Sequence, residues 1–120
     1  MMRLFIADDS KLLRQRLVEM LDRVKGVDII GEAGNAFDAV QAIERLKPDV
    51  VILDIRMPGG DGMLALEAIR KRGINSKIIM FTNYPYPQYK KRCLESGADY
   101  FITKSDDFEK IIGIVNELNQ

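Results

Sequence analysis

The sequence contains no histidine among its 120 residues. Histidine is the side chain that most readily gains and loses a proton near neutral pH, and it is the commonest metal ligand. Its absence excludes mechanisms in which this chain supplies an imidazole base, a histidine-ligated metal or a phosphohistidine. A reaction that needs such a group must find it on another molecule.

Cysteine and long apolar runs are also scarce. The single cysteine, Cys93, cannot form an internal disulfide, so nothing indicates an oxidising compartment. We expect it to be a small apolar residue on a helix. No apolar run approaches the ~20 residues that span a bilayer, and the run that starts at Leu4 is cut by Asp8 and Asp9 before it resembles a signal peptide. We therefore predict a cytoplasmic protein with no membrane contact.

Neither sign of charge dominates, since there are 18 basic and 18 acidic residues. Without a net positive field, direct binding of nucleic acid by this domain is not expected. The short basic stretches 70–72 and 90–92 are predicted to lie on solvated helix faces.

The length predicts one domain, residues 1–120, large enough for an ordinary hydrophobic core. Apolar runs that end at charged or small residues predict strands, and apolar residues at helical spacing predict helices. The expected strands cover residues 2–7, 27–33, 49–54, 77–82 and 99–103. The expected helices follow a cap at Ser10 up to Val24, and then cover residues 37–46, 63–70, 89–96 and 108–118.

Strand and helix alternate five times with short connections. This order is typical of an α/β fold with one doubly wound parallel sheet and helices on both faces. The continuous apolar run Val50–Leu53 agrees, because strands of such a sheet are buried on both sides.

Chemically active side chains follow the carboxyl ends of four predicted strands, where ligands bind in such folds. They are Asp8 and Asp9 after the first strand, Asp54 after the third, Thr82 at the end of the fourth, and Lys104 after the fifth. Two negative charges ~5 Å apart repel by about 3 kcal/mol at an effective dielectric near 20. Three carboxylates with one ammonium therefore need a cation or protons, and their hard oxygen ligands favour Mg²⁺.

Each of these residues has an ordinary structural role as an alternative. Asp9 alone suits a helix cap or turn, Thr82 suits a hydroxyl that bonds its own strand end, and Lys104 suits an exposed charge. Their joint occurrence at the ends of neighbouring strands favours one shared site.

These residues carry a resemblance to a known family. The sequence closely resembles the receiver domain of bacterial two-component response regulators over essentially its whole length. The matching stretches are Asp8-Asp9, LDIRMPGGDG at residues 53–62, Thr82, and GADYFITK at residues 97–104. The resemblance implies a flavodoxin-like sheet with strand order 2-1-3-4-5.

The resemblance also implies a role for each site residue. Asp54 resembles the phosphoacceptor, which takes a phosphoryl group from a histidine of a sensor kinase or a histidine phosphotransfer protein. Asp9, Asp54 and the backbone carbonyl of Arg56 resemble the Mg²⁺ ligands, and Asp8 would act through a bound water. Lys104 would pair with a phosphoryl oxygen. The missing histidine agrees with this, because the donor imidazole belongs to the partner.

A second group of residues resembles the switch. Thr82 would bond the phosphoryl group, Phe101 would fill the space that Thr82 vacates, and Met57 and Asn83 would contact the phosphoryl group or its loop. The surface built from the fourth helix, fifth strand and last helix would then change. An output domain, an effector or a second copy of the chain would contact that surface and carry the response. The domain would catalyse only its own phosphorylation and dephosphorylation.

The sequence departs from the family pattern at Asn83 and at Ser105. Asn83 replaces a small residue after the switch threonine, and Ser105 replaces a proline after Lys104, which leaves a cis bond there in question. Arg56 and Tyr84 flank the site, and we expect these long side chains to hinder water and prolong the life of the phosphoryl group.

Two other classes of protein remain as alternatives. A haloacid dehalogenase-type phosphatase also uses a nucleophilic Asp and Mg²⁺, but it needs an acid two positions later, where this chain has Arg56, and usually a cap domain. A pseudo-receiver would use the same fold as a binding module without phosphorylation. The sequence does not say whether an output domain follows.

Overall fold

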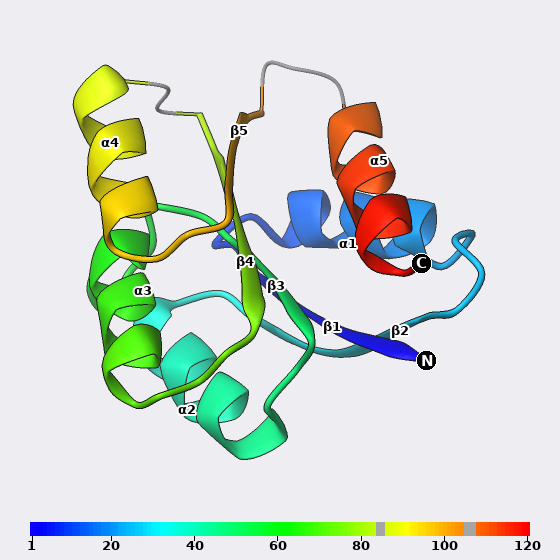
Figure 1. The fold of residues 1–120 in the computed structure, drawn as a ribbon, viewed down its shortest axis with the longest axis horizontal. Coiled ribbons are helices and arrows are strands. Elements are labelled where there is room, and N and C mark those ends of the chain that lie inside the picture. Colours follow the sequence, from blue (N-terminus) through cyan, green and yellow to red (C-terminus); the bar gives the residue numbers. More distant parts are fainter. Residues whose placement is uncertain (84–85, 105–107) are drawn as a thin grey trace.

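The computed structural model describes residues 1–83, 86–104 and 108–120. Strands and helices alternate along the chain (Figure 1). The strands are β1 (Met2–Ala7), β2 (Val27–Ala33), β3 (Val50–Leu53), β4 (Lys77–Thr82) and β5 (Tyr100–Thr103). The helices are α1 (Lys11–Leu21), α2 (Ala36–Leu46), α3 (Gly62–Lys71), α4 (Pro87–Glu95) and α5 (Glu109–Leu118). None of the described helices is long and apolar enough to cross a membrane.

The five strands form one parallel sheet in the order β2-β1-β3-β4-β5. This confirms the doubly wound fold and the strand order that the resemblance implied. The central strand β3 has all four of its residues buried, because helices cover it on both sides. All strand carboxyl ends point to the same edge, as parallel pairing requires.

Two apolar clusters lie on opposite faces of the sheet. Phe5 and Ala7 of β1 face the cluster formed with α2, α3 and Cys93 of α4. Leu4 and Ile6 of the same strand face the cluster formed with α1 and α5. Figure 1 shows the same division, with α2, α3 and α4 on one side of the sheet and α1 and α5 on the other. Alternate side chains of one strand thus hold both helical layers.

Local side chains account for several helix starts. The side chain of Ser10 accepts a hydrogen bond from the backbone N–H of Leu13, which confirms the predicted cap. Asn35 and Asp61 cap α2 and α3 in the same way. Helix α4 begins at Pro87 without a side-chain cap. Proline suits a first helical position because its missing N–H needs no partner there.

Some predicted boundaries were wrong by one to three residues. Helix α1 ends at Leu21 rather than Val24, because the N–H groups of Arg23 and Val24 bond only three residues back, to the carbonyls of Met20 and Leu21, in a tight turn. Strand β3 excludes both Asp49 and Asp54, and the Asp49 carboxylate accepts the N–H of Arg3 instead. The two aspartates lie at the ends of an apolar run, and their side chains form hydrogen bonds outside the backbone pairing of the sheet.

The predicted solvated face at residues 70–72 is correct for Lys71 and Arg72, which are exposed, but wrong for Arg70, which is half-buried. The Arg70 guanidinium donates to the carbonyls of Gly97 and Ile74 and lies 3.1 Å from the Asp99 carboxylate. It therefore ties α3 to the turn before β5. The prediction holds for the second stretch, since Lys90, Lys91 and Arg92 are exposed. Cys93 is fully buried on α4, as predicted.

Candidate functional site

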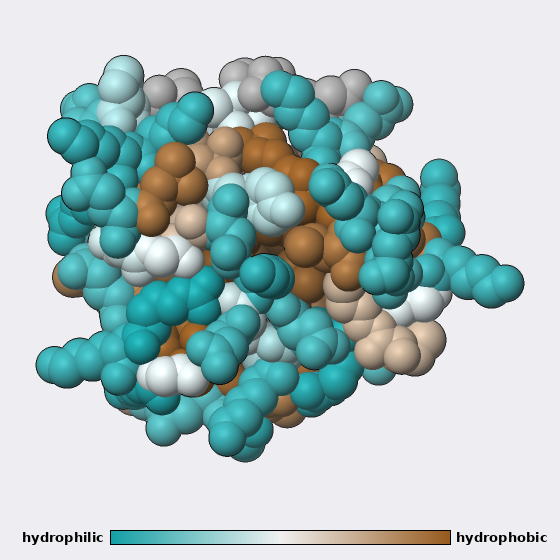
Figure 2. Space-filling view, in the orientation of Figure 1, coloured by the Kyte–Doolittle hydropathy of each residue, from teal (hydrophilic) through white to brown (hydrophobic). Residues whose placement is uncertain are grey.

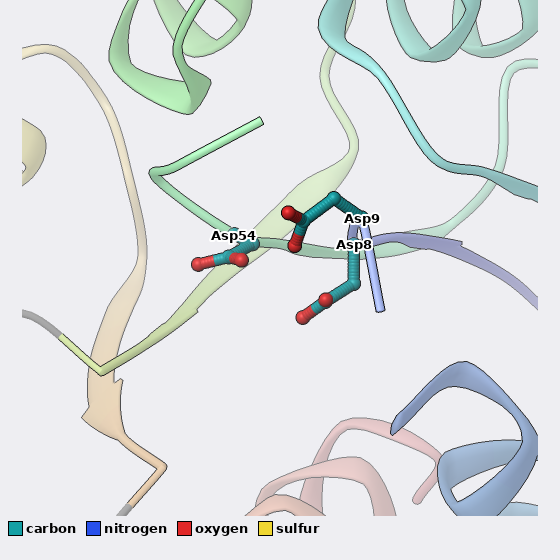
Figure 3. Close-up of side chains that lie close together, drawn as sticks. All are labelled: Asp8, Asp9 and Asp54. Atoms are coloured by element: carbon teal, nitrogen blue, oxygen red, sulfur yellow. The ribbon is translucent and has the colours of Figure 1, made fainter. Parts of the chain in front are cut away.

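The acidic site lies where β1 and β3 end beside each other. Ala7 is in register with Leu53, and the next residue along β3, Asp54, donates its N–H to the Ala7 carbonyl at 2.9 Å. Adjacent parallel strands thus place Asp8 and Asp54 on one rim. Oxygen atoms of the Asp8, Asp9 and Asp54 carboxylates lie within 4.8 Å of one another, and Figure 3 shows the three side chains gathered in one small space.

The three carboxylates differ in exposure and in their backbone contacts. Asp8 and Asp54 are 2% and 4% exposed, whereas Asp9 is exposed. One oxygen of Asp8 accepts the N–H of Ser10 at 2.9 Å, and one oxygen of Asp54 accepts the N–H of Ile55 at 2.8 Å. These bonds orient each buried carboxylate and leave its other oxygen for the interior of the site.

Lys104 brings the fifth strand into the same site. Its Nζ lies 2.6 Å from Oδ2 of Asp8 and 3.0 Å from Oδ2 of Asp54. Its backbone N–H donates to the Thr82 carbonyl at 2.7 Å, which holds the residue at the end of β4. The ammonium therefore bridges the two buried carboxylates, and the Lys104 side chain is not an exposed charge.

Burial and like charge perturb the ionisation of this group. Burial, and then the neighbouring charge of Asp8, raise the pKa of Asp54 to about 6 from 3.8, although Lys104 and the Ile55 N–H oppose the change. Burial alone would lower the pKa of Lys104, but its bonds to Asp8 and Asp54 raise it above 10.5. Lys104 is thus a fixed cation, whereas burial and the charge of Asp8 disfavour the ionised form of Asp54.

The donor chemistry of this site fits Mg²⁺. Three carboxylates and one ammonium leave an excess of negative charge that one divalent ion balances. The ligand atoms are carboxylate oxygens, which hard cations such as Mg²⁺ prefer. The close approach of the carboxylates, rather than their number, is the observation that supports a metal, since repulsion at this distance needs compensation.

A glycine explains how the loop after Asp54 returns to the site. A Cβ on Gly62 would lie 1.8 Å from the backbone oxygen of Asp54, well inside any allowed contact. The Gly62 N–H donates to the Ile55 carbonyl at 2.5 Å, which closes the loop. Only glycine fits here, so the DG pair at residues 61–62 combines a helix cap with a close backbone approach.

Comparison with known protein families shows to which family a chain with this site belongs. The model of the response regulator receiver domain matches residues 4–116. The chain belongs to the response regulator receiver domain family.

Relatives of this receiver domain include whole transcriptional regulators. The uncharacterized transcriptional regulatory protein YvfU of Bacillus subtilis is 35% identical over 117 residues. The match covers 98% of this chain but 58% of YvfU, so a large part of that protein has no counterpart in these 120 residues.

Solved structures of similar chains share the fold. A DNA-binding response regulator of the LuxR family from Staphylococcus aureus has a TM-score of 0.92 and 33% identity, with 100% of both chains covered. A chain of the CheX-CheY-BeF3-Mg²⁺ complex from Borrelia burgdorferi has a TM-score of 0.89 and 31% identity, with 97% of this chain and 87% of that chain covered.

Thr82 and Phe101, the predicted switch residues of the receiver domain, lie on β4 and β5, whereas Met57 and Asn83 lie in the loops after β3 and β4. Thr82 is fully buried at the end of β4, in register with Thr103 of β5. Phe101 is half-buried and packs against the cluster that includes α2 and α3. Asn83 is exposed and Met57 is buried.

Three further positions complete the predicted set. Arg56 is exposed in the loop after β3. Tyr84 and Ser105 lie outside the described residues. The expected effect of Tyr84 on phosphoryl lifetime and the question of a cis bond before Ser105 therefore stay predictions.

One contact of the receiver domain was not anticipated from the sequence. Nη1 of Arg14 lies 2.5 Å from the backbone oxygen of Asp8, and its Nε lies 3.1 Å from the Glu32 carboxylate. An arginine on the first helix after an acidic pair is too common a pattern to signal this contact. It depends on β2 lying next to β1, which the sequence alone does not show.

Proposed function

We propose that this receiver domain is a phosphorylation-dependent switch with Asp54 as the phosphoacceptor. The observation that supports this most directly is the Asp54 carboxylate at the end of the central strand, 3.0 Å from Lys104 and beside Asp8 and Asp9. The donor is a phosphohistidine of a sensor kinase or phosphotransfer protein, since this chain has no histidine of its own. An Asp54 oxygen bonds to phosphorus as the bond from phosphorus to the donor imidazole breaks.

Each neighbour of Asp54 has a distinct role in that phosphoryl transfer. Lys104 is a fixed cation, suited to stabilise negative charge on a phosphoryl oxygen. Asp9, Asp54 and the Arg56 carbonyl would hold Mg²⁺, with Asp8 acting through a water. When bound, Mg²⁺ supplies a template and compensating charge for phosphoryl oxygens. Asp8 also holds Lys104 in place, because its carboxylate contacts the same ammonium as Asp54 does.

Phosphorylation changes the charge at Asp54, and the switch residues respond to it by moving, which changes the surface of the domain. A phosphoryl group adds about −1.5 to −2 charge and three acceptor oxygens. The Thr82 hydroxyl bonds one of these oxygens, Met57 and Asn83 contact the group or its loop, and Phe101 occupies the space that Thr82 leaves. The loop into α4 then shifts, and with it the surface of α4, β5 and α5.

That surface is where a response would be transmitted. Figure 2 shows apolar side chains between α4 and α5, and Tyr100, Phe108 and Ile112 are half-buried in the cluster beneath them. An output domain, an effector or a second copy of the chain would bind there. We propose that the domain, residues 1–120, acts in the cytoplasm without contacting membranes or nucleic acid itself, and catalyses only its own phosphorylation and dephosphorylation.

The decisive experiment is incubation with acetyl phosphate and Mg²⁺, followed by intact-mass measurement. We expect an adduct of ~80 Da on the wild type and none on the Asp54→Asn variant. No adduct on the wild type would favour a pseudo-receiver. Continuous hydrolysis of phosphate esters would favour the phosphatase alternative, although the described residues place only an exposed arginine, Arg56, where that class needs its acid.

The lifetime of the phosphoryl group tests a finer expectation. Arg56 is exposed beside the site, and with Tyr84 we propose that it hinders an attacking water. The Arg56→Ala variant should then lose its phosphoryl group several times faster than the wild type after excess acetyl phosphate is removed. A wild-type half-life of seconds with Mg²⁺ present would contradict the proposal.

A further inference from the structure

Arg14 reaches the acidic site through the backbone rather than through a carboxylate. It lies on α1, one turn beyond the Ser10 cap, and its side chain is 17% exposed. Its Nη1 donates to the carbonyl of Asp8 at 2.5 Å, and its Nε donates to the Glu32 carboxylate of β2 at 3.1 Å. One guanidinium thus ties the turn after β1 to the neighbouring strand.

That turn carries the two acidic residues of the site. The carbonyl of Asp8 belongs to the peptide group that joins Asp8 to Asp9, so whatever holds this oxygen orients both residues. The N–H of Asp8 donates to Ala33 of β2 at 3.0 Å, so the turn is fixed to β2 directly on one side and through Arg14 on the other. Asp9 is exposed.

Gly34 provides the room for this guanidinium. A Cβ on Gly34 would lie 3.1 Å from Nη1 of Arg14 and 3.8 Å from the Asp8 carbonyl oxygen. The 3.1 Å distance is tighter than an ordinary van der Waals contact, so the guanidinium would have to move by a few tenths of an ångström to admit an added methyl group. Gly34 also needs no positive φ, which means that an alanine there is tolerated by the backbone.

We infer that Arg14 is a positioning residue, which holds the Asp8-Asp9 turn in the geometry that binds the divalent cation. The inference rests on the proposed function, because it assigns Arg14 a part in the same site. Removing a residue that orients the metal ligands without contacting the metal typically changes metal affinity by about 10–100-fold.

The sign of the effect separates positioning from simple electrostatics. A positive charge near a cation site repels the cation, so removing it should tighten Mg²⁺ binding if charge alone matters. Removing a positioning contact should weaken binding instead. Arg14→Met removes the charge and both hydrogen bonds, and Gly34→Ala disturbs the same guanidinium without changing any charge.

The experiment measures the Kd of Mg²⁺ by calorimetry for the wild type, Arg14→Met, Gly34→Ala and the control Arg16→Met, after circular dichroism shows that each is folded. Arg16 is exposed on the same helix, so its variant reports the loss of charge alone. We expect a Kd about tenfold higher for Arg14→Met, a smaller increase for Gly34→Ala, and no increase for Arg16→Met. The rate of phosphorylation at saturating Mg²⁺ should recover toward the wild-type value.

Two results would overturn the inference. An unchanged or lower Kd in Arg14→Met would show that Arg14 does not position the turn, while leaving Asp54 phosphorylation intact. A wild-type protein that binds no Mg²⁺ would overturn the proposed metal site, and this inference with it.

Discussion

Lys104 and Asp54, 50 residues apart in the sequence, form an ion pair of 3.0 Å at the rim of the sheet. The same ammonium bonds Asp8 at 2.6 Å and is 10% exposed. It is thus the cation that, among the described residues, contacts both buried carboxylates of the site.

Replacing Lys104 with Met should destabilise the protein without Mg²⁺. Two buried carboxylates would lose their partner, and breaking a buried pair costs about 3–5 kcal/mol. Added Mg²⁺ should restore much of the loss and bind more tightly than in the wild type, because the ammonium no longer competes for the same oxygens. Urea unfolding with and without Mg²⁺ measures both effects. The exposed Lys71→Met variant is the control, and equal losses in the two variants would contradict the prediction.

Asp54→Asn should stabilise the protein at pH 7.5 without Mg²⁺. Because burial raises the pKa of Asp54 from 3.8 to about 6, the native state holds this proton more tightly than the unfolded state. This contribution favours folding at low pH and is lost as the pH rises from about 4 to 6. Removing the charge should raise the free energy of unfolding by about 1–3 kcal/mol at pH 7.5.

The pH dependence checks the origin of that gain. The difference between Asp54→Asn and the wild type should shrink toward zero as the pH falls below about 4, where Asp54 becomes protonated in the unfolded state as well as in the native state. Urea unfolding at several pH values measures it. A variant less stable than the wild type at pH 7.5 would show that the bond to Lys104 outweighs the cost of burial.

Gly62→Ala should destabilise the fold by at least about 3 kcal/mol, because its Cβ would meet the backbone of Asp54 and Ile55. Gly113→Ala is the matched control. Gly113 is exposed on α5 and has open space around its Cβ position, so alanine there should stabilise by about 0.5–1 kcal/mol. Thermal unfolding of both variants measures the contrast, and a small loss in Gly62→Ala would mean that the loop relaxes freely.

Arg70→Met should cost about 1–3 kcal/mol, because the carbonyls of Gly97 and Ile74 lose a charged donor. Arg92→Met is the comparison, since its ion pair with Glu67 joins two exposed side chains and should contribute less than about 1 kcal/mol. Chemical unfolding distinguishes them. Equal losses of stability in the two variants would show that Arg70 contributes no more than an ordinary surface ion pair.

Much of the fold could be predicted from the sequence because its signals are local. Strands 27–33 and 77–82 have the predicted bounds, since apolar runs that end at small or polar residues mark them clearly. Errors occurred at 22–24, where backbone bonds to the third residue back replace the helical pattern at Arg23 and Val24. The strand order came from the family resemblance, because apolar patterning does not show which strands are neighbours.

The sequence by itself determined the alternation of strands and helices and the acidic, hydroxyl and amino groups that end four strands. It also determined that these 120 residues contain no histidine and so supply no phosphohistidine themselves. Only the tertiary structure decided that Lys104 bridges Asp8 and Asp54, that Arg14 holds the carbonyl of Asp8, and that Gly62 has no room for a side chain. These contacts join residues 6 to 96 positions apart, and they depend on strand order and side-chain direction, which no local pattern specifies.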